Sequence, residues 1–94
     1  PTFSLVRVYR GGCLSVYHID LYRVGPDQTG DIGLDECLAD PRGVCVVEWP
    51  EAAEAYYPAD RLEVSLSHVR MGRRLAFRAR GPRAKDILRR LEKK

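Results

Sequence analysis

The segment Val44-Cys45-Val46-Val47-Glu48-Trp49-Pro50 decides the fold class of this 94-residue chain. Its first four residues form a continuous apolar run, mostly β-branched, which predicts a strand buried on both faces. Strands of this kind occur in sheets that helices cover. The run ends abruptly in a carboxylate, an aromatic ring and a proline, so the segment predicts an α/β protein in which Glu48 directly follows a buried strand.

Two β-hairpins are predicted on either side of this segment. The runs 3–9 and 14–21 are rich in β-forming residues and are separated by Gly11-Gly12, which is typical of two antiparallel strands. Further along, apolar and polar residues alternate over 62–67 and 74–80 around a turn at Met71-Gly72. This alternation predicts a second hairpin with one face buried.

Short helices are expected in three places. The polar stretch 25–43 predicts one or two helical turns around Ile32, Leu34 and Leu38, with Pro26 suited to a first turn. Residues 51–57 are rich in Ala and Glu and predict a short helix closed by Pro58. After Pro82, the spacing i, i+3, i+4, i+7 predicts a C-terminal amphipathic helix whose basic side chains stay in water and whose packed stripe comprises Ala84, Ile87, Leu88 and Leu91.

The charge is unevenly distributed along the chain. The net charge is +3, but residues 70–94 hold 11 Lys or Arg against Asp86 and Glu92, a balance of +9, which leaves −6 for residues 1–69. A basic tail of this kind suits a polyanion such as nucleic acid, and the alternative is a solvated surface.

Length, cysteines and hydropathy indicate a small intracellular protein. A chain of 94 residues has room for one compact domain, and no apolar run approaches the ~20 residues that span a membrane. Cys13, Cys37 and Cys45 include no C-x-x-C pair, so we expect reduced thiols, with an intermolecular bridge as the alternative. We therefore expect a single domain over residues 1–94, in the cytoplasm.

Two carboxylates are the strongest candidates for chemistry. Asp20 lies near the end of a β-rich run and could hold Mg²⁺ through water, or pair with Arg23. Glu48 follows the buried strand, where ligands of open α/β sheets gather, and could orient a water or neutralise a metal. Its alternative role is to stabilise the N-terminus of the next helix.

Trp49 and His18 are weaker candidates. Trp49 could stack on a base or cover a nucleotide, although large aromatic residues are more often core or interface anchors. His18 shares a strand face with Asp20 and could support it, or it could be a hydrogen-bonded structural histidine. The 94 residues contain neither a nucleophile motif nor a glycine-rich phosphate loop.

Four segments together resemble the TsaE (YjeE) family in order and spacing: Pro1-Thr2-Phe3, His18-Ile19-Asp20-Leu21-Tyr22-Arg23, Asp31-Ile32-Gly33-Leu34-Asp35-Glu36 and Glu48-Trp49-Pro50-Glu51. The resemblance implies a P-loop NTPase-like fold with a mixed sheet, and an ATPase that acts with TsaB and TsaD in threonylcarbamoyladenosine modification of tRNA. It also implies ATP and Mg²⁺ as cofactors.

The resemblance assigns roles to particular residues of this chain. Thr2 matches the family's switch threonine near the nucleotide, Asp20 its magnesium-associated aspartate, and Glu48 and Trp49 its catalytic-region glutamate and the neighbouring tryptophan. Glu48 is thus expected to be catalytic and close to the metal, and Thr2 and Trp49 to lie near the nucleotide.

The family's G-x-x-x-x-G-K-[ST] loop would precede Pro1, so these 94 residues alone are expected to bind ATP no tighter than about millimolar and not to hydrolyse it. The alternative function is a non-enzymatic module that binds tRNA or a protein through its basic tail.

Overall fold

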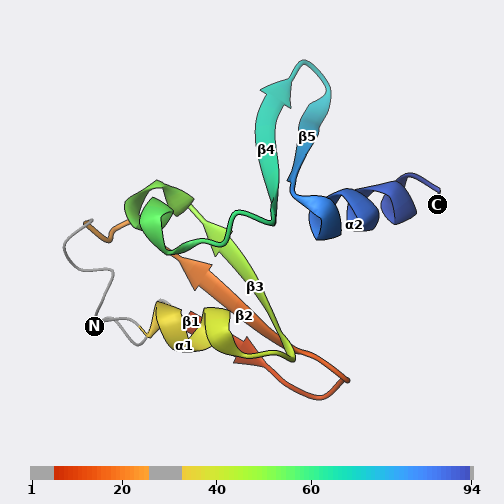
Figure 1. Ribbon diagram of the computed structural model, residues 1–94. Coiled ribbons are helices and arrows are strands. Elements are labelled where there is room, and N and C mark those ends of the chain that lie inside the picture. Colours follow the sequence, from red (N-terminus) through yellow and green to blue (C-terminus); the bar gives the residue numbers. More distant parts are fainter. Residues whose placement is uncertain (1–5, 26–32, 94) are drawn as a thin grey trace. The chain divides into compact units, whose positions relative to one another are not determined.

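The computed structural model describes residues 6–25 and 33–93, and the chain divides into two compact units, Pro1–Tyr57 and Pro58–Lys94. Figure 1 shows the elements of both units. No helix among the described residues is long and apolar enough to cross a membrane. Because each unit is described by itself, the expectation of a single domain stays a prediction.

The first unit is built on a mixed three-stranded sheet with the order β1-β2-β3. β1 (Val6–Tyr9) and β2 (Ser15–Asp20) are antiparallel, which confirms the first hairpin for the described residues. β2 and β3 (Gly43–Glu48) are parallel and in register from the Ser15–Gly43 pair to the Asp20–Glu48 pair. The α/β fold class with a mixed sheet is therefore confirmed.

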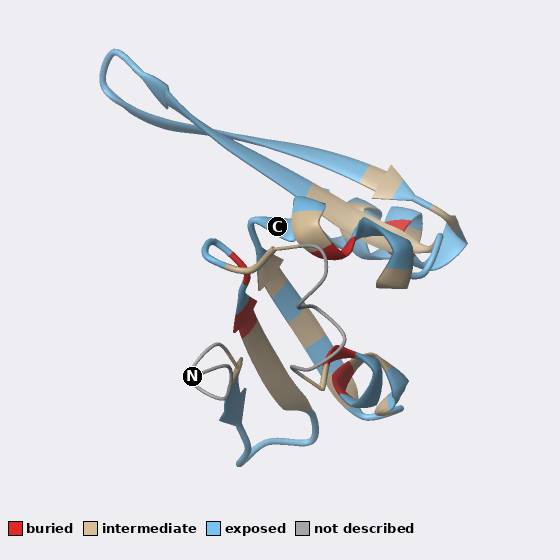
Figure 2. Cartoon of the chain, turned by 90° about the vertical axis from the view of Figure 1, so that its left-hand side faces the viewer, coloured by how far each residue is buried: buried red, intermediate tan, exposed pale blue. Residues whose placement is uncertain are grey.

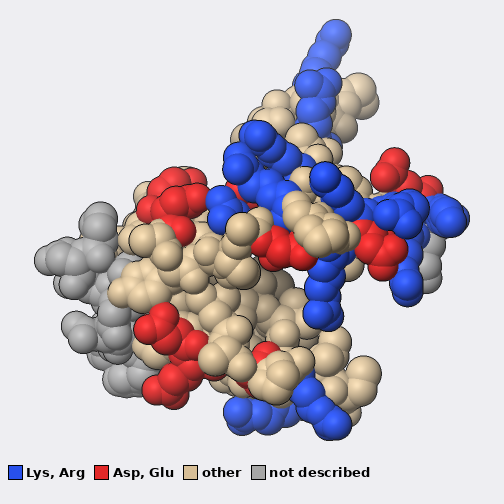
Figure 3. All heavy atoms as spheres, in the orientation of Figure 1, with Lys and Arg blue, Asp and Glu red and all other residues tan. Residues whose placement is uncertain are grey.

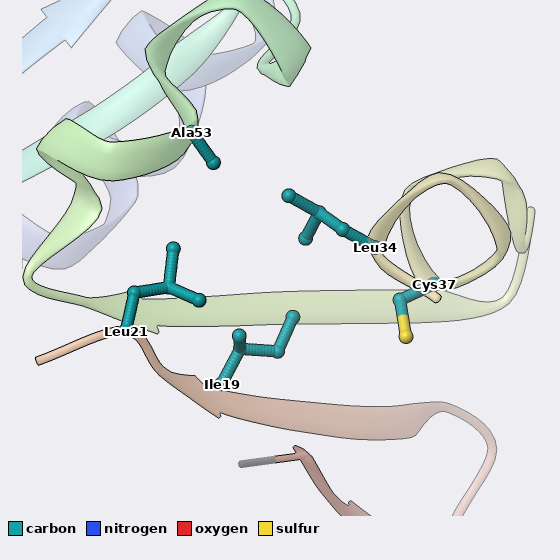
Figure 4. Packing of buried hydrophobic residues seen from close by; sticks show 5 residues of the cluster. All are labelled: Ile19, Leu21, Leu34, Cys37 and Ala53. Carbon is teal, nitrogen blue, oxygen red and sulfur yellow. The ribbon is translucent and has the colours of Figure 1, made fainter. Parts of the chain in front are cut away.

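A short α-helix and a 3₁₀ helix cover one face of this sheet. The α-helix α1 spans Leu34–Ala39, where helical turns were predicted, and Ile32 and Pro26 lie outside the described residues. The predicted helix over 51–57 is instead the 3₁₀ helix η3 (Pro50–Tyr56). Ile19, Leu21, Leu34, Cys37 and Ala53 form the core beneath them (Figure 4).

The opposite face of the sheet is not covered by described residues. Val44 and Val46 of β3 are 41% and 49% exposed, and burial alternates along the strand. The prediction that this strand is buried on both faces is therefore wrong for the described residues. The apolar run does form a strand, but α1 and η3 both pack on the side of Val47 and Cys45.

A polar contact joins the loop before β3 to β2. The Tyr17 hydroxyl donates to Asp40 Oδ2 over 2.6 Å, and the Arg42 amide donates to Asp40 Oδ1 over 2.9 Å. These bonds lower the pKa of Asp40, with the Tyr17 bond as the largest cause, and the same bond raises the pKa of Tyr17. A Cβ at Gly43 would lie 2.8 Å from Tyr17 Cε2, so a larger residue at this position would force the Tyr17 ring to shift.

The second unit is an antiparallel hairpin followed by a helix. β4 (Arg61–Val69) pairs with β5 (Gly72–Arg80), and α2 spans Pro82–Glu92. The hairpin and the helix are confirmed. The prediction of a buried hairpin face is wrong for the described residues, because Leu66, Leu75 and Phe77 are 68%, 51% and 40% exposed. Figure 2 shows most of the hairpin in pale blue, the colour of exposed residues. Strand alternation sorts residues by face, but it does not supply a layer to cover that face.

The helix α2 packs through a narrower stripe than predicted. Ala84 is 3% exposed and Leu88 is partly buried, whereas Ile87 and Leu91 are 47% and 50% exposed. Its first turn is capped by a residue distant in sequence. Asp60 Oδ2 accepts the Arg83 amide over 3.0 Å, and Asp60 Oδ1 accepts the Ala84 amide over 2.9 Å.

Candidate functional site

The ends of β2 and β3 bring the two predicted carboxylates together. Asp20 and Glu48 are direct register partners on neighbouring parallel strands. Register partners in a parallel pair project on the same face, and both strands end at the same edge of the sheet. The two carboxylates therefore lie on one side of the sheet, and both residues are exposed.

A backbone hydrogen bond and a buried side chain hold this edge in place. The Leu21 amide donates to the Glu48 carbonyl over 3.1 Å and extends the ladder one residue beyond β2. The Leu21 side chain, 2% exposed, anchors the same point in the core. The backbone that carries Asp20 and Glu48 is therefore held in place by the buried neighbouring residue Leu21.

Asp20 is engaged by a local turn. Its Oδ1 accepts the Tyr22 amide over 3.0 Å. The alternative of an ion pair with Arg23 is not found among the ion pairs of residues 6–25 and 33–93. Asp20 Oδ2 has no hydrogen bond to any described residue and remains available to a ligand.

His18 contacts Glu48 directly. Its Nε2–H donates to Glu48 Oε2 over 2.7 Å, and the His18 and Glu48 side chains are 34% and 52% exposed. His18 lies two residues before Asp20 on the same strand face. Its ring is hydrogen-bonded, as the structural alternative expected, but the bonding partner is Glu48, the candidate catalytic residue, and not Asp20. Period-two alternation places His18 on this face, but only the register of β2 against β3 identifies Glu48 as its partner.

Two aromatic rings stand beside the carboxylates. The centroids of Tyr22 and Trp49 are 5.0 Å apart with an interplanar angle of 53°. Both residues are exposed, at 63% and 56%, so Trp49 is not a core residue of the described chain. Sequence reasoning missed Tyr22, because its pairing with Trp49 joins the segments that follow β2 and β3 and has no local sequence signal.

Trp49 has an unusual backbone conformation. Its φ of 55° and ψ of 58° lie in the left-handed region, and it is the one non-glycine residue with positive φ among the described residues. The following Pro50 disfavours the right-handed α region at this position. A large side chain in this region carries strain of about 1–3 kcal/mol, which is often found at functional sites. The turn directs the chain from β3 into η3.

The exposed carboxylates are better suited to Mg²⁺, which keeps several water ligands, than to a metal ion that is bound only by protein side chains. The described residues contain no group of three or more His, Cys, Asp or Glu side chains that could hold a metal ion. Mg²⁺ needs only one or two carboxylates, since water and phosphate oxygens complete its shell. Asp20 Oδ2 and Glu48 Oε1, neither bonded to a described residue, fit that requirement. Thr2, the remaining candidate, lies outside the described residues.

The three cysteines are free thiols, with Cys13 exposed and Cys37 buried. Burial raises the pKa of Cys45 to about 11 and also raises that of Cys37. Thiolate chemistry at these two positions is therefore disfavoured, and neither adds a reactive group to the carboxylate edge.

Comparison with known proteins gives one consistent family. Residues 1–76 match the model of the threonylcarbamoyl adenosine biosynthesis protein TsaE. The chain is 39% identical over 69 residues to the Bacillus subtilis protein named tRNA threonylcarbamoyladenosine biosynthesis protein TsaE, a match covering 73% of this chain and 42% of that protein. It is 40% identical over 75 residues to the Treponema pallidum protein of the same name, covering 79% of this chain and 54% of that protein.

A solved structure agrees with this result. The crystal structure of Bacillus subtilis YdiB matches with a TM-score of 0.71 and 30% identity, over 97% of this chain and 57% of that one. The chain thus spans about half the length of the relatives it matches.

Proposed function

Because the chain belongs to the TsaE family, we propose that it serves in threonylcarbamoyladenosine modification of tRNA, as part of a cytoplasmic ATPase that acts with TsaB and TsaD. The observation that carries the proposal is the pairing of Asp20 with Glu48 at the ends of adjacent parallel strands. In open α/β sheets this is the edge at which ligands bind.

Glu48 is the residue we assign to the attacking water. A carboxylate beside a transferring phosphoryl group orients the water and accepts its proton as attack begins. His18 holds Glu48 Oε2 by its 2.7 Å hydrogen bond, which leaves Oε1 to face the water. The histidine thereby limits the rotamers of an otherwise half-exposed side chain.

Asp20 and the aromatic pair are assigned to the nucleotide and its metal. Asp20, together with Glu48, would hold Mg²⁺ through water, and the ion would neutralise charge on the phosphate oxygens. Trp49 and Tyr22 offer exposed ring surface on which an adenine base can stack. Thr2 is assigned to the nucleotide as a switch residue, by its match to the family motif.

The 94 residues on their own are expected to bind ATP weakly. They contain no glycine-rich loop ending in Lys and Ser or Thr, and such a loop supplies most of the backbone N–H groups that hold phosphates. Calorimetry with Mg²⁺ and ATP should give a dissociation constant of about 1 mM or weaker. A tight, magnesium-dependent complex would contradict this expectation.

The catalytic assignment is tested in a polypeptide that joins these residues to an upstream segment carrying the family's G-x-x-x-x-G-K-[ST] loop. Glu48→Gln should lower kcat for ATP hydrolysis about 100-fold or more, while the affinity for ATP changes less than about threefold. Glu51→Gln is the matched control, since Glu51 is also exposed and lies three residues away in η3. Equal, small losses in kcat and affinity for both variants would refute the role of Glu48.

Asp20 and His18 have separate readouts in the same assay. Asp20→Asn should raise the Mg²⁺ concentration needed for half-maximal rate, because a neutral amide is a poorer partner for the hydrated ion. His18→Gln keeps a donor to Glu48 and should retain more kcat than His18→Ala, with unchanged KM for ATP. Identical rates for the two His18 variants would show that the hydrogen bond does not position Glu48.

A further inference from the structure

The second unit carries a long segment without negative charge. Residues 64–85 contain seven Lys or Arg and no Asp or Glu, the cationic residues being Arg70, Arg73, Arg74, Arg78, Arg80, Arg83 and Lys85. Figure 3 shows Lys and Arg side chains gathered over the hairpin and α2. The four Arg of the turn and the adjoining part of β5, residues 70–78, are all exposed.

The nearby acidic residues are already engaged elsewhere. Glu63 Oε2 accepts from Arg61 Nε over 3.0 Å and from Arg80 Nε over 3.1 Å, and these bonds, that of Arg61 first, lower the pKa of Glu63. Asp60 caps α2, and Asp86 pairs with two arginines of its own helix. Glu63 is the cross-strand partner of Arg78, but no ion pair among the described residues joins them. The four Arg of residues 70–78 therefore have no ion pair with any described residue.

The two faces of the hairpin differ in chemistry. Directly opposed residues of antiparallel strands share a face, so Ser67 stands beside Arg74, and Ser65 beside Ala76. This polar face continues to the Glu63–Arg78 pair, and its one large apolar side chain is Val69, opposite Gly72 at the turn. The other face carries Val64, Leu66, Leu75 and Phe77.

The polar face has the donors that phosphates use. Arg and Ser are among the residues that contact phosphate oxygens in nucleic acid complexes, whereas the centre of a protein interface needs apolar or aromatic anchors. Arg74 and Arg78 are four residues apart on one strand, about 13 Å at the rise of a β-strand. One phosphate group cannot bridge that distance, so the row suits a polymer with repeated negative charges.

We propose that the turn and polar face of the β4–β5 hairpin, with Arg70, Arg74 and Arg78, bind the phosphate backbone of an RNA. This contact goes beyond the ATPase proposal, which requires no contact between this chain and RNA. The surface reads backbone charge rather than base sequence, because it offers guanidinium and hydroxyl groups on an open strand face.

The test measures binding of the 94-residue chain to a fluorescently labelled tRNA transcript by anisotropy, from about 50 to 200 mM KCl. Three phosphate contacts predict a slope of log K against log salt of roughly −2 to −3. Arg74→Gln with Arg78→Gln should weaken binding about tenfold or more at the lowest salt and reduce the slope by roughly 1 to 2.

The control removes the same charge from α2. Arg89→Gln with Arg90→Gln deletes two exposed cations that already pair with Asp86, and it should change affinity less than about twofold. Arg74→Lys with Arg78→Lys keeps the charge and should retain the salt slope, which separates phosphate binding from a folding defect. Circular dichroism of each variant checks that the fold is kept.

Three results would overturn the proposal. The first is the absence of salt-dependent tRNA binding by the wild-type chain. The second is an equal loss in the hairpin and α2 variants, which would mean that only net charge matters. The third is unchanged tRNA affinity in the hairpin variant together with weaker binding to a TsaB–TsaD complex, which would make this face a docking site for an acidic protein.

Discussion

Asp60→Ala should release the first turn of α2. Gly81 precedes the helix and offers no side-chain cap, and Pro82 has no N–H to satisfy, so the Arg83 and Ala84 amides depend on the Asp60 carboxylate at 3.0 and 2.9 Å. Water can replace the bond to the exposed Arg83 amide. The Ala84 amide belongs to a residue only 3% exposed, and leaving it unpaired costs about 1–3 kcal/mol. This range agrees with the usual cost of removing a helix cap, so we expect Asp60→Ala to lower the stability of α2 by about 2 kcal/mol.

Native-state amide hydrogen exchange by NMR measures this loss locally. A change of 2 kcal/mol corresponds to roughly 30-fold faster exchange of the α2 amides, and Asp60→Asn, which keeps an acceptor oxygen, should show a smaller increase. Asp86→Ala is the control, because it removes a carboxylate of α2 that pairs only with exposed arginines and should cost about 0.5 kcal/mol. Exchange in Asp60→Ala within twofold of wild type would refute the capping argument.

Three further predictions concern the first unit. The pKa of Asp40 is held below its ordinary value of 3.8, mainly by the Tyr17 hydroxyl, so the contribution of Asp40 to stability is complete above that value and is lost as pH falls through the folded pKa. The difference in urea midpoint between wild type and Asp40→Asn should therefore be largest near pH 6 and shrink below pH ~4, and a constant difference would contradict the assignment. Trp49→Gly should have a higher urea midpoint than Trp49→Ala, and a free energy of unfolding about 1 kcal/mol larger. Both variants lose the ring, but only glycine tolerates φ of 55° without strain. Equal midpoints would argue against strain. Iodoacetamide at pH 8 should modify Cys13 at least ~10 times faster than Cys37 or Cys45, as mass spectrometry of peptides would show, and all three should react alike in denaturant.

The strands, the turns and the order of the elements were predictable because they depend on local patterns. Apolar runs and glycine or proline punctuation located β1 to β5 and α2, since side-chain alternation and backbone restriction act within a few residues. Asp20 and Glu48 were identified because each stands at or near the end of such a run, and the position of a carboxylate near a strand end can be read from the sequence alone.

The burial of those strands was not predictable in the same way. Val44 and Val46 have the composition of a covered strand, and Leu66 and Phe77 that of a covered hairpin face, yet all four are 40% or more exposed. Hydrophobicity shows which side chains gain from burial, but whether another layer reaches them depends on the whole tertiary arrangement.

By itself, the sequence determined the family, the secondary structure and the two acidic strand ends, because these follow from residue types at fixed spacing. The tertiary structure alone decided that β2 and β3 run parallel in a register that pairs Asp20 with Glu48, hydrogen-bonds His18 to Glu48 and places Tyr22 beside Trp49. Register is a long-range property, because a slip of one residue would leave every local pattern intact and move each of these side chains to the other face.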